Sequence, residues 1–187
     1  RRIAGLQESK LSRIDLAIES YRRILELDGR DAEAIQSLMR LYQTEERYED
    51  LISILRRAAE QAQEREQSVK YLFNIATVWE NELGLDEEAI DAYRDVLEFE
   101  SSHLSSLQAL ERIYTRLDRW SELIGVFEKQ VELVAGTEEK IKVLHKMGSI
   151  WEERFSNIEN AAICNEQILD LDPKHLASIK ALELLVQ

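Results

Sequence analysis

An internal repeat is the feature that most constrains the fold of this chain. Ala17, Ala89 and Ala161 follow one another at equal steps, since 89 − 17 and 161 − 89 are both 72. Without any gap, this repeat step aligns further apolar and aromatic positions along most of the chain: Tyr21 with Tyr93, Leu25 with Leu97 and Leu169, Leu38 with Leu110 and Leu182, Tyr42 with Tyr114, Tyr48 with Trp120, and Trp79 with Trp151. Such self-similarity at a fixed period indicates a stack of repeated units, each of which buries its apolar face against its neighbours.

Each block of one repeat step is predicted to contain two helical hairpins. Within residues 104–140, Leu107, Leu110 and Tyr114 are spaced by three and four positions, which places them on one face of a helix. The apolar pattern is then interrupted and resumes at Trp120, which indicates a second helix. The 187 residues include one proline and six glycines, far below the roughly 5% and 7% of average usage. A β-rich or disordered chain would need more of these turn residues, so both classes are disfavoured.

Polar residues at four positions are predicted to begin helices. Asp86 and Thr137 are candidate N-caps. Ser156, with a glutamate three positions later, has the spacing of a capping box. Asp172 and the proline that follows it have the pattern of an N-cap and a first-turn proline.

With these features the chain resembles the tetratricopeptide repeat (TPR) family, whose units of about 34 residues carry apolar, small and aromatic residues at fixed steps. The residues that carry the resemblance are Met147-Gly148-x-x-Trp151, Ala161 and Pro173 in one unit, and Ile75-Ala76-x-x-Trp79, Ala89 and Tyr93 in another. Two other units depart from the family pattern. In these units Met39 and Glu111 replace the small residue of the first helix, and Leu51 and Leu123 replace the alanine of the second.

The resemblance implies an all-α fold, a right-handed α-solenoid of antiparallel helical hairpins that coil into a TPR-like superhelix. Residues 1–187 are expected to form a single solenoid, in which Trp79 and Trp151 are largely buried between helices. The expected units are a partial unit at 1–31, units at 32–68, 69–103, 104–140 and 141–175, and a partial unit at 176–187. The chain is interpreted as a piece of a longer array, whose exposed ends, including Leu182–Val186, could join copies of the chain into a homo-oligomer.

The sequence carries none of the common catalytic signatures, so the chain is predicted not to be an enzyme and to need no cofactor. It has no G-x-G-x-x-G, P-loop, H-E-x-x-H or G-x-S-x-G motif. His103 and His175 are one repeat step apart, which gives them the same loop position in two repeats and argues against a shared metal site. Cys164 is the only cysteine and is assigned to packing. The many carboxylates are expected to face solvent.

The candidate binding residues come from the resemblance to TPR arrays, in which the first helix of each hairpin lines the concave face. The peptide-binding groove implied for this chain is lined by Arg40, Lys70, Phe73, Asn74, Thr77, Gln108, Arg112, Arg116, Lys142, His145 and Lys146. Basic residues therefore gather on one inferred face of a chain with a net charge of −13. This arrangement favours an acidic segment or a terminal carboxylate as the partner. An ordinary solvated surface with scattered charges is the alternative interpretation.

The family's carboxylate clamp is incomplete in this chain. Lys142 and Lys146 are similar to two of its positions, but Phe73, Thr77 and Ala109 stand where its other Lys and Asn residues would be. The resemblance therefore does not imply binding to the tails of chaperones.

The function implied is a protein–protein interaction scaffold that binds a peptide or a partner domain in its concave groove. One alternative is the repeat region of a larger enzyme whose catalytic domain lies outside this chain, and another is a repeat array from RNA processing, which the acidic charge disfavours. That charge also argues against nucleic acid as a partner, and the lack of a run of about 18 apolar residues argues against a membrane. A cytoplasmic location is expected because no signal peptide is visible, although the chain begins at Arg1 rather than at a methionine.

Overall fold

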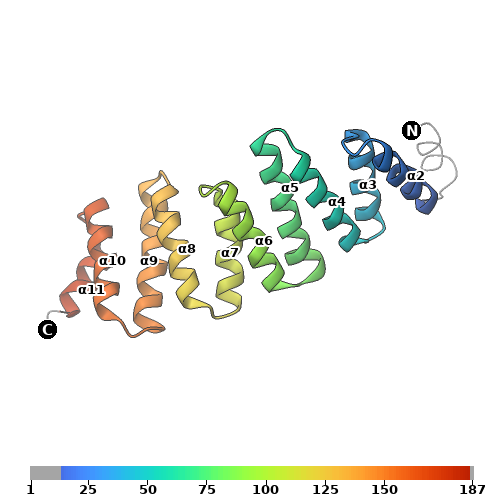
Figure 1. Ribbon diagram of the computed structural model, residues 1–187. Helices are drawn as coiled ribbons and strands as arrows, with labels where there is room; N and C mark the ends of the chain where they lie inside the picture. The colour runs from blue at the N-terminus through green and yellow to red at the C-terminus, as the bar shows by residue number, and fades with distance from the viewer. Residues whose placement is uncertain (1–13, 186–187) are drawn as a thin grey trace. The chain divides into compact units, whose positions relative to one another are not determined.

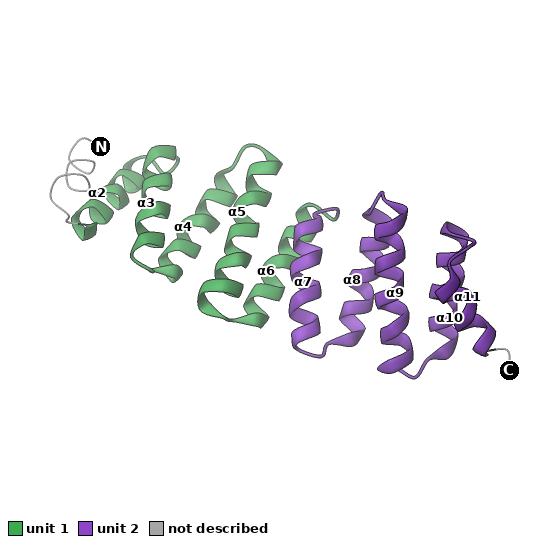
Figure 2. Cartoon of the chain, turned by 180° about the vertical axis from the view of Figure 1, so that it is seen from behind, with its two compact units in different colours: residues 1–101 green, residues 102–187 purple. Residues whose placement is uncertain are grey.

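The computed structural model describes residues 14–185, while residues 1–13 and 186–187 lie outside the described residues (Figure 1). The beginning of the first predicted unit and the last two residues of the final one therefore cannot be compared with it. The described residues form helices joined by short turns, without any strand. Contacts divide the chain into two compact units, residues 1–101 and 102–187 (Figure 2), and each is described by itself.

Unit 1, residues 1–101, is a series of helices in which each packs on the next one along the chain. Its elements are α2 (Ile14–Leu27), α3 (Ala32–Thr44), α4 (Tyr48–Gln61), α5 (Arg65–Val78), the π-helical turn η1 (Trp79–Leu83) and α6 (Asp86–Phe99). The turn η1 directly continues α5, and successive helices run antiparallel (Figure 1).

Unit 2, residues 102–187, repeats this arrangement with one helix packed on the next. Its elements are α7 (Leu104–Arg116), α8 (Trp120–Leu133), α9 (Thr137–Glu153), α10 (Ile158–Leu171) and α11 (Leu176–Leu185). Within each unit the chain is thus a stack of antiparallel helical hairpins, and the predicted all-α solenoid is confirmed. The exact limits of the repeats, such as 32–68 and 104–140, stay a prediction.

Small residues lie where two helices of a hairpin touch. Ala17, Ala89 and Ala161, the residues that define the repeat step, are all buried. A Cβ atom added to Gly148 of α9 would lie 3.3 Å from the Cβ atom of Cys164 on α10. Because such a contact is already tight, any larger residue at this position would have to push the two helices apart.

Three helices begin with an N-cap side chain at equivalent positions of the repeat. The side chain of Asp31 accepts a hydrogen bond from the backbone N–H of Ala34 in α3. The ring Nδ1 of His103 accepts one from the backbone N–H of Ser106 in α7, and His175 caps α11 in the same way. The loop position predicted for the two histidines is therefore that of a helix cap, which satisfies an N–H group that lacks a partner within the helix.

The predicted helix starts are wrong in detail. Ser156 has a positive φ of 50°, and the side chain that caps α10 is that of Asn157. Asp86 and Thr137 are the first residues of their helices and not the capping residues. Asp172 ends α10, so its proline lies in a turn instead of beginning α11.

Two further expectations about burial need correction. Trp79 and Trp151 are half-buried rather than largely buried. The carboxylate of Glu80 does not face solvent: it is buried within unit 1 and accepts a hydrogen bond from the hydroxyl of Tyr93, with 2.6 Å between the two oxygen atoms. The π-helical turn η1 carries Glu80 toward α6, where the fully buried Tyr93 lies.

We expect Tyr93→Phe to destabilise the chain by about 1–3 kcal/mol, because the substitution removes a hydrogen-bond donor from a buried carboxylate. Tyr71→Phe is the matched control, since Tyr71 lies half-buried on α5 and its hydroxyl makes no hydrogen bond within the described residues. Urea denaturation followed by circular dichroism measures both. Equal midpoints for the two variants would show that the Tyr93–Glu80 bond contributes nothing to stability.

Candidate functional site

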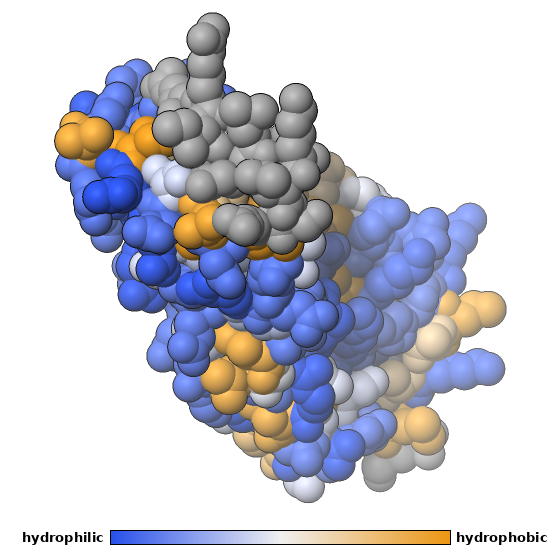
Figure 3. All heavy atoms as spheres, turned by 90° about the vertical axis from the view of Figure 1, so that its right-hand side faces the viewer, coloured by the Kyte–Doolittle hydropathy of each residue, from blue (hydrophilic) through white to orange (hydrophobic). Residues whose placement is uncertain are grey.

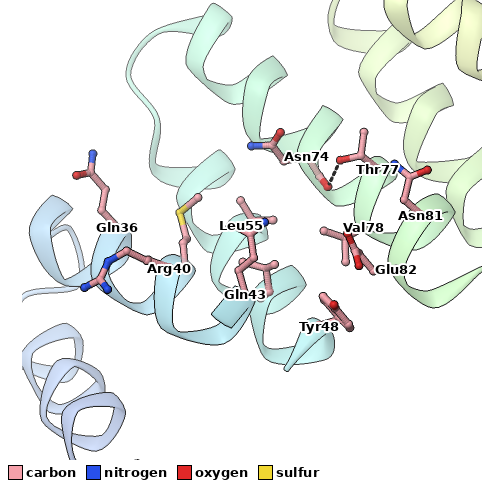
Figure 4. A pocket seen from close by; sticks show the side chains of 12 residues that line it. Gln36, Arg40, Gln43, Tyr48, Leu55, Asn74, Thr77, Val78, Asn81 and Glu82 are labelled. Carbon is pink, nitrogen blue, oxygen red and sulfur yellow. Dashed lines mark hydrogen bonds between the residues drawn. The ribbon is translucent and has the colours of Figure 1, made fainter. Parts of the chain in front are cut away.

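Unit 1 contains an open pocket of about 400 Å³ between α3, α4, α5 and η1 (Figure 4). Three residues predicted for the groove, Arg40, Asn74 and Thr77, line it. The pocket thus brings together predicted residues of α3 and α5, and their role in binding stays a prediction. The residues that it missed are Gln36, Met39, Gln43, Tyr48, Leu51, Leu55, Val78, Asn81 and Glu82.

The pocket combines an apolar floor with a rim of side-chain amides. Leu51, Leu55 and Val78 are buried and form the apolar part of the lining. The four amide side chains around them, Gln36, Gln43, Asn74 and Asn81, lie at the surface. Each amide offers both donor and acceptor atoms, so together they can pair with the N–H and C=O groups of an extended backbone.

One end of the pocket is formed by Tyr48 and Glu82. Tyr48 begins α4 and is half-buried, and Glu82 lies in η1 at the surface. A hydrogen bond to the Glu82 carboxylate raises the pKa of the Tyr48 hydroxyl above its ordinary value. Figure 4 shows Arg40 at the opposite side of the pocket from these two residues.

The remaining predicted residues of α5 do not line this pocket. Lys70 pairs with Glu66 one helical turn earlier, with 2.6 Å between Nζ and the carboxylate oxygen, and this hydrogen bond raises the pKa of Lys70. Phe73 packs against the ring of Tyr93, with 5.6 Å between the ring centroids. Phe73 therefore belongs partly to the packing between α5 and α6.

In unit 2 the predicted residues lie on the two corresponding helices. Gln108, Arg112 and Arg116 are exposed on α7, and Lys142, His145 and Lys146 lie on α9. Lys142 pairs with Glu138 of its own helix, with 2.7 Å between Nζ and the carboxylate oxygen. Two lysines of the predicted basic line, Lys142 and Lys146, thus have an acidic partner within unit 2.

Glu111 connects three helices of unit 2. Its carboxylate accepts hydrogen bonds from Lys146 of α9 at 2.7 Å and from Gln130 of α8 at 2.9 Å. Gln130 is buried. The residue that replaces the family's small side chain in this unit therefore acts as a polar bridge, which neither the spacing nor the composition of the sequence revealed.

In unit 2, the positions equivalent to the unit 1 pocket carry two cations, and these cations lie over aromatic rings of unit 2. The guanidinium of Arg154 lies over the ring of Trp120, with 4.6 Å between its central carbon and the ring centroid. The ammonium of Lys146 lies 6.0 Å from the centroid of Phe127. One repeat step earlier, these two cations are replaced by Glu82 and Asn74.

A second cavity, of about 390 Å³, lies in unit 2 between α8, α9 and α10. Leu144, Met147 and Trp151 line it together with Cys164. Burial raises the pKa of the Cys164 thiol to about 11, so the thiol is protonated at neutral pH. This is the behaviour of a packed cysteine rather than of a reactive one, as the sequence predicted.

The face of the molecule seen in Figure 3 shows no large apolar patch. Hydrophilic residues predominate there, and apolar residues form small separate groups. Among residues 14–185, none of the helices has the length and apolar character that crossing a membrane requires.

Comparison with known proteins finds a tetratricopeptide repeat in one part of the chain. Residues 106–141 match the family model described as tetratricopeptide repeat. No curated protein matches the chain in sequence.

Solved structures resemble the fold at low sequence identity. YrrB, described as a TPR protein with an unusual peptide-binding site, is 18% identical, with a TM-score of 0.50 over 97% of this chain and 89% of that one. MamA is 18% identical, with a TM-score of 0.52 over 94% of this chain and 97% of that one. The C-terminal part of a TPR repeat-containing protein from Cytophaga hutchinsonii is 15% identical, with a TM-score of 0.53 over 96% of this chain and 70% of that one. Identities this low support the fold alone.

Stability should fall as the pH drops below the ordinary histidine value, because of His145. Partial burial and the neighbouring His175, whose ring centroid lies 5.0 Å away, lower the pKa of His145 in the folded chain. In the unfolded chain, His145 therefore binds a proton at a higher pH, about 6.5. The contribution of neutral His145 is complete above that pH and is lost as the pH falls toward the lower folded pKa.

Urea denaturation at pH 7.5 and pH 5.5 measures this effect. His145→Gln should lose less stability between the two pH values than the unchanged chain does, since carboxylates contribute equally to both. The same loss in both proteins would contradict the assignment.

Proposed function

Because residues 106–141 match the tetratricopeptide repeat model and the fold resembles solved TPR proteins, we propose that this chain is a protein-interaction scaffold and that the pocket of unit 1 binds an extended segment of its partner. The observation that carries the proposal is the pocket itself, where an apolar floor lies within a rim of four surface amides. An extended segment exposes backbone N–H and C=O groups at regular intervals, and amide side chains pair with both. The floor would receive an apolar side chain of the same segment.

The predicted line of basic residues gives weaker support for an acidic partner than the pocket gives for an extended one. Lys70, Lys142 and Lys146 each pair with a glutamate of their own unit, and an acidic partner would have to compete with these ion pairs. The acidic partner therefore stays a prediction from the sequence. Binding of two copies of the chain also stays a prediction from the sequence.

The proposed role needs no catalytic residue in this chain, and TPR scaffolds in general are not enzymes. A contribution to a larger enzyme, as its repeat region, would use the same pocket to hold a substrate protein or another domain. A cytoplasmic location stays a prediction from the sequence.

Peptides selected from a random library on the full 187-residue chain test the proposal. We expect Gln36→Ala and Asn74→Ala to weaken binding of the selected peptides about fivefold or more each, since a lost hydrogen bond costs about 1 kcal/mol. Both side chains lie at the surface, so the stability of the chain should hardly change.

Gln108→Ala is the matched control, because Gln108 is the residue that corresponds to Gln36 in unit 2. Calorimetric titration of one peptide against the three variants compares the two units directly. An equal loss of affinity for Gln36→Ala and Gln108→Ala would show that the unit 1 pocket is not the binding site. No loss of affinity for Gln36→Ala and Asn74→Ala would show the same.

A further inference from the structure

One difference between the two units at equivalent positions indicates which side chain the unit 1 pocket accepts. In unit 2, Trp120 begins α8 and Arg154 follows the last residue of α9. The guanidinium of Arg154 lies 4.6 Å from the centroid of the Trp120 ring. In unit 1 the equivalent residues are Tyr48, which begins α4, and Glu82, which lies in η1. The aromatic ring is kept, but the cation is replaced by a carboxylate.

The turn that follows these positions closes in the same way in both units, although Glu82 lies in a π-helical turn and Arg154 follows an α-helix. The backbone N–H of Leu85 bonds to the carbonyl of Trp79 at 2.9 Å, and that of Asn157 bonds to Trp151 at 2.8 Å, one repeat step later. Gly84 between them in unit 1 has a φ of 64°, and the corresponding serine of unit 2 has a φ of 50°. An equivalent turn therefore follows Glu82 in unit 1 and Arg154 in unit 2.

The Tyr48 ring of unit 1 lines an open pocket of about 400 Å³ instead of being covered by the equivalent cation of its own unit. Glu82 lies beside it in the pocket lining, and its carboxylate raises the pKa of the Tyr48 hydroxyl. A carboxylate has two oxygen atoms and several acceptor sites, so it retains capacity for a further donor. Glu46, Arg47 and Glu49 line a second pocket together with Tyr48. Arg40 lies across the first pocket (Figure 4).

We propose that this end of the unit 1 pocket binds an arginine side chain of the partner, whose guanidinium lies over Tyr48 and pairs with Glu82. The guanidinium occupies the place that Arg154 takes over Trp120 in unit 2, so that unit 2 supplies its own cation while unit 1 receives one from the partner. An aromatic face and an adjacent carboxylate both attract a cation. A planar guanidinium uses both at once, which an ammonium group does less well.

This inference rests on the proposed function and deepens it, since it names one side chain of the segment that the pocket binds. It also differs from the acidic partner predicted from the sequence. The net charge of −13 would speed the approach of a cationic segment.

The test selects peptides from a random library on the full chain and then replaces the cation of the tightest peptide by citrulline, which keeps the shape of arginine without its charge. We expect arginine to be enriched at one position of the selected peptides, and citrulline to weaken binding tenfold or more. Glu82→Arg, which builds the cation of unit 2 into unit 1, should abolish the difference between the two peptides, and Glu82→Gln should reduce it.

Glu88→Arg is the control, because it makes the same change of charge at an exposed position of α6 away from the pocket, and it should preserve the preference for arginine. Circular dichroism checks that all three variants keep their helices. Sensitivity to Gln36→Ala shows that a selected peptide binds the pocket. If such peptides show no preference for arginine, this inference is overturned and the proposed function stands. Selected peptides insensitive to Gln36→Ala and Asn74→Ala would overturn both.

Discussion

The close contact between the two helices of a hairpin is the constraint on which the rest of this structure depends. Ala89 and Ala161 are buried where one helix meets the next, and Gly148 leaves little room for a side chain against Cys164. These small residues set the distance between helix axes, and the larger apolar residues can then fill the remaining space at a fixed register. The repeat step from Ala89 to Ala161 reflects this register in the sequence, because the same close contact recurs at the same interval.

Much of the fold could be predicted because this register is periodic. The helices and their order follow from the spacing of residues such as Leu107, Leu110 and Tyr114. The helix ends could not be predicted as well, since caps depend on backbone angles that the residue type does not determine. Ser156 illustrates this limit: its spacing is that of a capping box, but its positive φ leaves the cap to Asn157.

The candidate site was predicted only in part, for a reason that the pocket makes clear. Arg40, Asn74 and Thr77 could be found because a solenoid exposes one side of its first helices. Tyr48 and Glu82 were missed, since they come from the start of a second helix and from a π-helical turn. The repeat itself contained the missing signal: Tyr48 aligns with Trp120 and Glu82 with Arg154, so that a carboxylate stands in one unit where a cation stands in the other.

The contact between Gly148 and Cys164 has a consequence for how the end of the array can be studied. The thiol is buried between α9 and α10, and 3.3 Å separates its Cβ atom from the place where a Cβ of Gly148 would be. A thiol reagent therefore reaches Cys164 only when the cavity between α8, α9 and α10 widens or these two helices move apart. Because Cys164 is the only cysteine of the chain, its rate of labelling reports the local opening of one hairpin, without any engineered probe and separately from the unfolding of the remaining repeats.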